Sequence, residues 1–323
     1  MKAVRLHAYG PADHLTYEEV PDLRPAEGEV RIDVRASGVH LIETRLRSGL
    51  RVGPHEPPTL PTIMGDEVAG PIDAVGPGVD PAWIGRRVVA SLGGEGGYAE
   101  QATAPLDAVH PLPDRLDDAT AVAMITTGAT AMGLLGLARP TAADVVLIPS
   151  AAGGIGGLLV QAAKAAGATV VGVSGGPEKT ARVTNLGADI SVDYRRDDWP
   201  EQVAKALGDR AVSLAFDGVG GQIGRRTLEL VGPGGRLLLH GWASGEPTAF
   251  TVQDLIERGL TVGWAIGPHL MPDGWRALET QALEQAATGA LTPLITRFPF
   301  ETASEAHTCL EERRAEGKVV LIR

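Results

Sequence analysis

The chain has 323 residues, and its 29 Lys and Arg against 40 Asp and Glu give a formal net charge of −11. At this length two domains are expected. Nucleic acids and anionic membranes are bound by basic surfaces, and no run of Lys or Arg supplies one, so we expect neither as a partner and favour a small molecule.

The first part of the chain predicts short strands separated by turns. Val30–Ala36 alternates apolar and polar residues, as a half-buried strand does. Pro57-Pro58, Pro77-Gly78 and Gly93-Gly94 indicate loops. An antiparallel, barrel-like domain is therefore expected before position 122.

One apolar segment, Ala119–Ala138, has the length of a membrane span, at about 20 residues. It contains Thr126, Thr127 and Thr130 and lacks flanking charge asymmetry. A buried helix pair is therefore the favoured interpretation.

From Val145 to about Ile266, apolar runs alternate with helical stretches, and after Pro268 the chain returns to helix, loop and strand. This alternation predicts a doubly wound parallel sheet, with a nucleotide-binding domain (122–266) inserted between two parts of the other domain (1–121 and 267–323). The predicted strands are Val145–Pro149, Thr169–Ser174, Leu214–Asp217 and Arg236–His240, with helices over Gly154–Ala166 and Pro177–Leu186.

A glycine-rich turn after the first of these strands predicts a dinucleotide site. Ala151, Gly153 and Gly156 occupy the three fingerprint positions, and Gly154 and Ile155 lie between them. The middle position lets the backbone approach a pyrophosphate, and the third lets the helix pack on the sheet. Strand, turn and helix occur in the required order.

The end of the next strand predicts which dinucleotide binds. An acidic residue there would hold the ribose 2′-hydroxyl of NAD. Instead Ser174-Gly175-Gly176 follows the strand, and Lys179 comes one turn into the next helix. Because Ser174 and Lys179 can contact a 2′-phosphate, NADPH is the predicted cofactor.

The lone cysteine, Cys309, forms no internal disulfide and no thiol cluster for zinc. It falls in a helix-like run, Ala303–Arg314, where core packing is expected. The first residues carry no apolar signal-peptide core. We therefore expect a cytoplasmic protein.

The chain resembles the quinone oxidoreductase (zeta-crystallin-like) branch of the zinc-independent medium-chain dehydrogenase/reductase superfamily over nearly its whole length. The resemblance implies an α/β protein with a Rossmann domain inserted in a GroES-like substrate domain and a cleft between them. Besides the fingerprint, it rests on Gly38-Val39-His40, Arg47-Ser48-Gly49, Gly65-Asp66-Glu67, Gly97-Tyr98-Ala99-Glu100, Leu186-Gly187-Ala188-Asp189, Asp217-Gly218-Val219-Gly220-Gly221, Pro233-Gly234-Gly235-Arg236 and Gly317-Lys318-Val319-Val320.

The resemblance also implies cofactor contacts and a homodimer. Dimers of the family pair through the edge of the nucleotide-domain sheet, for which Leu260–Ala265 is the candidate here. The implied cofactor contacts are Ser174, Lys179 and Tyr194 around the 2′-phosphate, Thr127 near the nicotinamide ribose, Val219, Gly241 and Ala243 on the nicotinamide side, and Lys318 reaching back toward the cofactor.

The absence of zinc ligands points to the chemistry. Related alcohol dehydrogenases place Cys and His where this chain has His40 and Asp66. Without a Lewis acid, alcohol oxidation is disfavoured, whereas hydride transfer to a quinone or another α,β-unsaturated carbonyl needs only the cofactor and an oxyanion contact. An NADPH-dependent oxidoreductase acting on such a small molecule is the leading hypothesis.

His40 is the candidate catalytic residue because the family usually has Asn there. It is predicted to donate a hydrogen bond or proton to the acceptor oxygen. Alternatively it binds the nicotinamide ribose, or it joins Asp66 and Glu67 in a metal site of an alcohol dehydrogenase. A non-catalytic NADPH-binding protein is a further alternative.

Other residues are candidates for the substrate pocket. Trp242, Trp264 and His269 are predicted to line it, with core packing as the alternative for the tryptophans. Arg47 is predicted to anchor an oxygen, or to pair with a carboxylate such as Glu43. Asp66 is predicted to border the cleft or to stabilise its loop.

Overall fold

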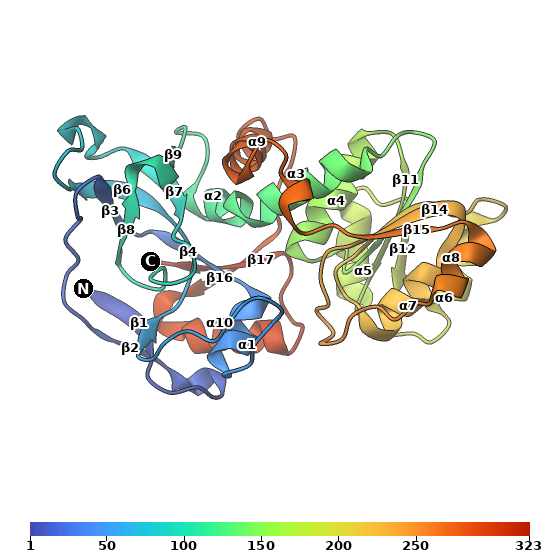
Figure 1. Ribbon diagram of the computed structural model, residues 1–323, viewed down its shortest axis with the longest axis horizontal. Coiled ribbons are helices and arrows are strands. Elements are labelled where there is room, and N and C mark those ends of the chain that lie inside the picture. The colour runs from blue at the N-terminus through green and yellow to red at the C-terminus, as the bar shows by residue number, and fades with distance from the viewer. The chain divides into compact units, whose positions relative to one another are not determined.

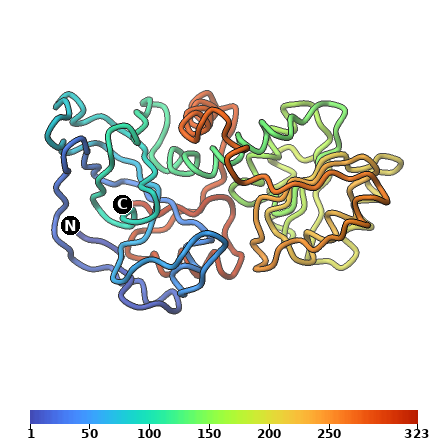
Figure 2. The backbone as a smooth tube through the Cα atoms, in the orientation of Figure 1, coloured from blue at the N-terminus to red at the C-terminus, as the bar shows by residue number.

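The computed structural model describes residues 1–323 and divides the chain into two compact units. The split unit contains Met1–Gly128 and Glu279–Arg323, and the inserted unit contains Ala129–Leu278. Figure 2 shows the blue N-terminal and red C-terminal segments running together in the split unit. From the sequence, the domain boundaries are expected between residues 121 and 122 and between residues 266 and 267, whereas the compact units divide after residues 128 and 278. The expected boundaries remain predictions.

The split unit is built on β-strands (Figure 1). An antiparallel sheet has the order β2-β1-β5, and a larger one has the order β16-β17-β4-β6-β3-β8, with β7 joining β6 to β9. The strands are β1 (Lys2–Leu6), β2 (Leu15–Glu19), β3 (Glu29–Asp33), β4 (Ala36–Val39), β5 (Thr62–Ile63), β6 (Glu67–Val75), β7 (Arg87–Ser91), β8 (Gln101–Pro105), β9 (Val109–Pro111), β16 (Ile295–Pro299) and β17 (Lys318–Ile322); the helices are α1 (Leu41–Arg47), α2 (Asp118–Ile125) and α10 (Ala303–Glu311).

The single strand predicted over Val30–Ala36 is wrong, because the chain forms two strands there, β3 and β4. Between them Val34 N–H donates to the Glu100 carbonyl (2.9 Å) and Arg35 N–H to the Ala69 carbonyl (2.8 Å). At the bend between β3 and β4, these hydrogen bonds to other segments thus replace the regular hydrogen bonds of a continuous strand. A period-two pattern continues through such a bend and does not reveal it.

The apolar segment 119–138 forms the predicted helix pair, α2 followed by α3 (Thr127–Ala138), with a bend of 45° between the helices. No single helix of the chain is long and apolar enough to cross a membrane, and only this bent pair passes a test of length and composition. Ala121–Ile125 of α2 are fully buried. Cys309 on α10 is also buried, at 4% exposed, which confirms the predicted core packing.

The inserted unit is the predicted doubly wound sheet. All of its pairings are parallel, in the order β12-β11-β10-β13-β14-β15. Its strands are β10 (Val145–Pro149), β11 (Thr169–Ser174), β12 (Ile190–Asp193), β13 (Val212–Asp217), β14 (Val231–Leu239) and β15 (Thr261–Trp264); its helices are α4 (Gly154–Ala165), α5 (Pro177–Asn185), α6 (Trp199–Leu207), α7 (Gly221–Leu230) and α8 (Val252–Arg258), and α9 (Trp275–Ala287) leads back to the split unit.

This strand order places the change of direction between β10 and β13. In doubly wound sheets, ligands bind outside the carboxyl ends of the strands at that point. The turns that follow β10, β11, β13 and β14 therefore lie where a ligand is expected to bind.

Candidate functional site

The turn after β10 has the shape of a pyrophosphate cradle. A β-carbon on Gly156 would lie 2.3 Å from the Ser150 carbonyl oxygen, and one on Gly153 would lie 3.1 Å from it. Gly156 therefore has to lack a side chain for α4 to start this close to the strand. No side chain caps α4, so the N–H groups of its first turn remain for a ligand.

The turn after β11 carries the residues predicted for the 2′-phosphate. Ser174 is only 1% exposed, and its hydroxyl lies 3.4 Å from that of Thr180. Lys179 and Tyr194 are half-buried. A β-carbon on Gly175 would lie 3.2 Å from Cε2 of Tyr194, so the phenol ring borders the turn. Ser174 thus contributes mainly to the shape of the turn.

Arg195 borders the same turn and was missed by the sequence reasoning. Its Nε would lie 3.0 Å from a β-carbon on Gly175, and its Nη1 3.1 Å from one on Gly176. The Asp193 carboxylate brings a negative charge nearby, but its Oδ1 accepts from the backbone N–H groups of Gly176 (2.8 Å) and Arg195 (2.9 Å). The sequence does place an arginine directly after Tyr194. Because Arg196 follows as well, the sequence alone does not show which of the two arginines faces the turn.

The loops after β13 and β14 hold one another at the predicted nicotinamide side. Asp217 is fully buried, and its Oδ1 accepts from the N–H groups of Val219 (2.8 Å) and Gly220 (3.0 Å). Ala243 N–H donates to the Gly218 carbonyl (3.0 Å). These bonds bring the loops that carry Val219, Gly241 and Ala243 together, and their place beside the nicotinamide remains a prediction. Thr127, by contrast, lies at the start of α3 and is 8% exposed.

His240 is a second residue that the sequence reasoning missed. It follows β14, and its ring packs so closely on Gly218 that a β-carbon there would lie 2.4 Å from Cε1. Burial lowers the pKa of His240 to about 4, so the imidazole is neutral at physiological pH. No sequence pattern distinguished this histidine from one at a strand end on the surface.

Trp242, Trp264 and His269, the residues predicted for the substrate pocket, lie close to one another, and their role in a pocket remains a prediction. The two indole rings lie 5.2 Å apart with planes inclined by 38°. His269 Nε2 donates to the Trp264 carbonyl oxygen (2.9 Å). Trp264 is 44% exposed, so the alternative of core packing is wrong for this residue.

His40 begins α1 in the split unit and contacts two buried charged groups. Its Nε2 lies 2.7 Å from Lys318 Nζ and 3.0 Å from Glu67 Oε1, and Lys318 Nζ lies 2.7 Å from Glu67 Oε2. Burial opposes ionisation of Glu67, yet the charges of His40 and Lys318 outweigh it and hold the pKa of Glu67 well below its usual range. The His40 side chain remains 23% exposed.

Lys318 therefore differs from its prediction. Its ammonium group is engaged by Glu67 and His40 within the split unit, and the residue is only 5% exposed. The reason is the pairing of β17 with β4, in which Val319 is opposite Val39. We do not propose a cofactor contact for Lys318.

Arg47 also differs from its prediction. It is 1% exposed, donates from Nε to the Gly10 carbonyl (3.1 Å) and from Nη2 to Glu311 (2.5 Å). A residue enclosed in this way cannot anchor a substrate oxygen. The carboxylate that it binds is Glu311 on α10, not the suggested Glu43.

Glu43 is buried and accepts hydrogen bonds at the start of α1. Its Oε2 accepts from His40 N–H (2.7 Å) and from the Tyr98 hydroxyl (2.6 Å), which also lies 3.1 Å from His307 Nε2. Burial raises the pKa of Glu43 and lowers that of His307 to about 3. The backbone of His40 is thus held by a buried polar network.

Asp66 lies in the loop before β6, where its Oδ2 accepts from the Ser91 hydroxyl (2.9 Å) and its carbonyl from Leu92 N–H (2.6 Å). This supports the reading that it stabilises its loop. No three side chains of His, Cys, Asp or Glu form a group that could hold a metal ion, so His40, Asp66 and Glu67 do not assemble one.

Comparisons with known proteins agree with the two-part fold. Residues 26–114 match the model of the alcohol dehydrogenase GroES-like domain, and residues 154–284 match that of the zinc-binding dehydrogenase domain. The chain is 31% identical to a quinone oxidoreductase of Pseudomonas aeruginosa, covering 99% of each chain. It is 30% identical to a 2-haloacrylate reductase of a Burkholderia species, covering 99% of this chain and 98% of the relative.

Among solved structures, a mycobacterial protein in complex with NADPH is 32% identical, with a TM-score of 0.87 and full coverage of both chains. Full-length identity above 30%, the two domain models and the shared fold lead to one assignment. This chain belongs to the quinone oxidoreductase branch of the medium-chain dehydrogenase/reductase superfamily.

Proposed function

We propose that the chain is an NADPH-dependent oxidoreductase that transfers hydride to a quinone or another α,β-unsaturated carbonyl without using zinc. The observation that carries the proposal is the pair of glycine turns after β10 and β11. In the first, Gly156 has to lack a side chain for α4 to start this close to β10, which leaves the uncapped N–H groups of α4 at the turn. The second is bordered by Arg195 and Tyr194, a combination suited to the extra phosphate of NADPH.

NADPH fits this site on the chain's own geometry. The first turn of α4 would bind the pyrophosphate through uncapped N–H groups. Arg195, Lys179 and Tyr194 would surround the 2′-phosphate, and Val219, Gly241 and Ala243 would line the nicotinamide. When bound, the cofactor supplies the hydride.

His40 is the residue that we propose for the acceptor oxygen. An imidazole that donates to a developing oxyanion lowers the barrier of hydride addition to a conjugated carbonyl. Glu43 holds its backbone, and Lys318 and Glu67 hold its ring. Trp242 and Trp264 offer apolar surface for a planar acceptor.

The direct test is oxidation of NADPH and of NADH by the purified chain with quinones, enones and alcohols, with metal content measured on the same sample. We expect turnover with quinones or enones, a preference for NADPH, and no loss of activity after treatment with a chelator. Activity restricted to alcohols and dependent on metal would favour an alcohol dehydrogenase. NADPH binding without any turnover would favour a non-catalytic role.

We also propose a homodimer formed through the edge strand β15. This strand pairs only with β14, so its other edge has no strand partner. Three of the eight exposed large apolar side chains lie shortly before this strand, at 40% to 71% exposed: Phe250, Val252 and Ile256.

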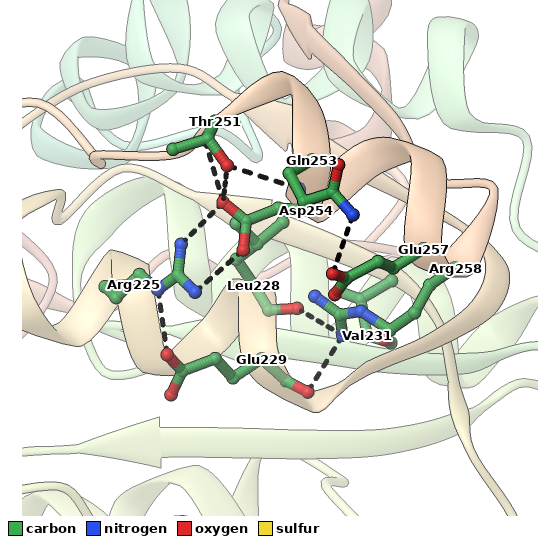
Figure 3. Close-up of polar contacts among 9 residues, drawn as sticks. All are labelled: Arg225, Leu228, Glu229, Val231, Thr251, Gln253, Asp254, Glu257 and Arg258. Carbon is green, nitrogen blue, oxygen red and sulfur yellow. Dashed lines mark hydrogen bonds and ion pairs between the residues drawn. The ribbon is translucent and has the colours of Figure 1, made fainter.

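Polar contacts hold both ends of helix α8 (Figure 3). Thr251 and Asp254 form a capping box at its start, and Arg225 binds Asp254 with both terminal nitrogens (2.9 and 2.8 Å). At its end, Arg258 donates to carbonyl groups where α7 meets β14, including that of Val231 at 2.7 Å. Val252 and Ile256, four residues apart, are left exposed at 71% and 69%.

Light scattering coupled to gel filtration tests the dimer. We expect twice the chain mass for the wild type and the chain mass for Ile256→Lys. Ile84→Lys is the matched control, because Ile84 is also exposed, at 52%, but lies in the split unit. A monomeric wild type, or a dimer undisturbed by Ile256→Lys, would contradict this interface.

A further inference from the structure

His240 lies at the carboxyl end of β14, directly before Gly241. Its backbone N–H donates to the Asp217 carbonyl (2.8 Å) and so continues the pairing of β14 with β13. The ring packs on Gly218, because a β-carbon there would lie 2.4 Å from Cε1, 2.9 Å from Nδ1 and 3.0 Å from Nε2. The imidazole therefore lies at the edge of the sheet where doubly wound folds bind ligands.

The imidazole of His240 has no side-chain partner within the chain. The charge that acts on it is that of Asp217, but both oxygens of this carboxylate are engaged elsewhere. Oδ1 accepts from the backbone N–H groups of Val219 and Gly220, and Oδ2 accepts from the Thr248 hydroxyl. The polar group that contacts the ring is the backbone of His240 itself. A single carbonyl group engages one ring nitrogen, so the other nitrogen is left for a ligand.

The charge state of the ring limits the kind of ligand. Burial lowers the pKa of His240 to about 4, so the imidazole is neutral and has one N–H donor and one acceptor nitrogen. Such a ring suits an uncharged polar group, whereas phosphates are bound by cations and by helix N-terminal N–H groups. A leucine would fill a similar space without leaving a polar nitrogen unpaired, so packing alone does not require a histidine here.

The neighbours of the ring are residues that we propose for the nicotinamide side. The Gly218 carbonyl accepts from Ala243 N–H (3.0 Å), and a β-carbon on Gly241 would lie 3.1 Å from that carbonyl oxygen. His240 is half-buried, so the residue is still accessible to a ligand. The uncharged polar group at the nicotinamide end of NADPH is the carboxamide, which has both an N–H donor and a carbonyl acceptor.

We propose that His240 binds the carboxamide of the nicotinamide through the ring nitrogen that its own backbone leaves free. Because a carboxamide both donates and accepts, it pairs with either nitrogen of a neutral imidazole. The hydrogen bond limits rotation of the nicotinamide and so helps to orient the atom that delivers the hydride. The identity of this ligand rests on the proposed function.

Nitrogen-15 NMR of histidine side chains in the wild-type chain tests the contact without any acceptor. The chain has eight histidines, and the signals lost in His240→Gln identify those of His240. We expect these signals to shift when NADP⁺ binds. They should stay in place when ADP-ribose 2′-phosphate binds, because this nucleotide has the same phosphates but no nicotinamide. Unshifted His240 signals with NADP⁺ bound, or equal shifts with both nucleotides, would overturn the proposal.

Dissociation constants of variants measure the strength of the contact. A hydrogen bond between uncharged groups corresponds to a roughly three- to tenfold change in Kd. His240→Leu should weaken binding of NADP⁺ by about this factor and change that of ADP-ribose 2′-phosphate by less than about twofold. His240→Gln keeps a donor and an acceptor and should recover most of the affinity.

His7→Leu is the matched control, because it makes the same substitution at an exposed histidine of the split unit, and it should leave both Kd values unchanged. Equal losses for the two nucleotides in His240→Leu would count against a carboxamide contact. The wild-type NMR comparison decides the question even if His240→Leu fails to fold.

These measurements also separate the contact from the proposed function. A chain that shows the expected His240 shifts with NADP⁺ but oxidises NADPH with none of the acceptors would refute the proposed oxidoreductase and support the contact. Turnover of quinones or enones with unshifted His240 signals would overturn the contact and leave the function standing. A chain that binds neither NADP⁺ nor NADPH would overturn both.

Discussion

Replacing Arg195 with alanine is the sharpest test of the proposed NADPH preference. The change removes the guanidinium group beside Gly175 and Gly176. It leaves the Asp193 carboxylate in place, because that group accepts from the backbone N–H groups of Gly176 and of residue 195 itself. The turn should therefore keep its shape while losing one positive charge.

The expected magnitude follows from the exposure of this arginine. A hydrogen bond to a charged group contributes about 1.5–3 kcal/mol. Arg195 is exposed, so the lower end applies, and a loss of about 1.5 kcal/mol corresponds to a roughly tenfold weaker Kd for NADPH. NADH lacks the 2′-phosphate, so its Kd should change by less than about twofold.

Titration of nucleotide fluorescence gives both dissociation constants at one fixed salt concentration. Arg196→Ala is the matched control, because this neighbouring arginine pairs with Asp198 at 3.1 Å, and both side chains are more than half exposed. It should leave both affinities unchanged. Equal losses for NADPH and NADH in Arg195→Ala, or the same loss in Arg196→Ala, would refute the assignment of this turn to the 2′-phosphate.

Further predictions concern other parts of the chain. Lys179→Ala should raise KM for NADPH far more than for NADH, and equal effects in steady-state kinetics would contradict its role. Gly156→Ala should destabilise the chain by about 1–3 kcal/mol in urea unfolding and abolish NADPH binding, because its β-carbon would lie 2.3 Å from the Ser150 carbonyl oxygen; wild-type affinity would refute this. His40→Ala should lower kcat by about 100-fold with an almost unchanged Kd for NADPH, and an unchanged kcat would reduce His40 to a scaffold residue. Burial lowers the folded-state pKa of His307 to about 3 from its ordinary value of 6.5, so its contribution to stability is present above pH 6.5 and is lost as the pH falls toward 3. The contribution of His307 to the loss of stability between pH 7 and 5 should therefore be about 2 kcal/mol, measured as the difference in the pH dependence of urea unfolding between the wild type and His307→Gln.

The nucleotide-binding fold could be predicted from local sequence. Val145–Pro149 and Thr169–Ser174 form strands with the predicted bounds, because short buried runs of β-branched residues end at glycine or helix-starting residues. The positions of Ala151, Gly153 and Gly156 specify a turn that few other residues allow. In such segments the physical cause lies within a few residues of its effect.

The surroundings of His40 were decided by the tertiary structure. Lys318 reaches His40 across 278 positions of sequence, and Arg47 reaches Glu311 across 264, because β17 pairs with β4 and α10 lies near α1. The sequence supplied these residue types but contained no local pattern that pairs them. Whether Arg195 or Arg196 faces the glycine turn also depended on the direction in which the chain leaves β12. Secondary structure follows from nearby residues, whereas the partner of a charged side chain follows from strand pairing between distant segments.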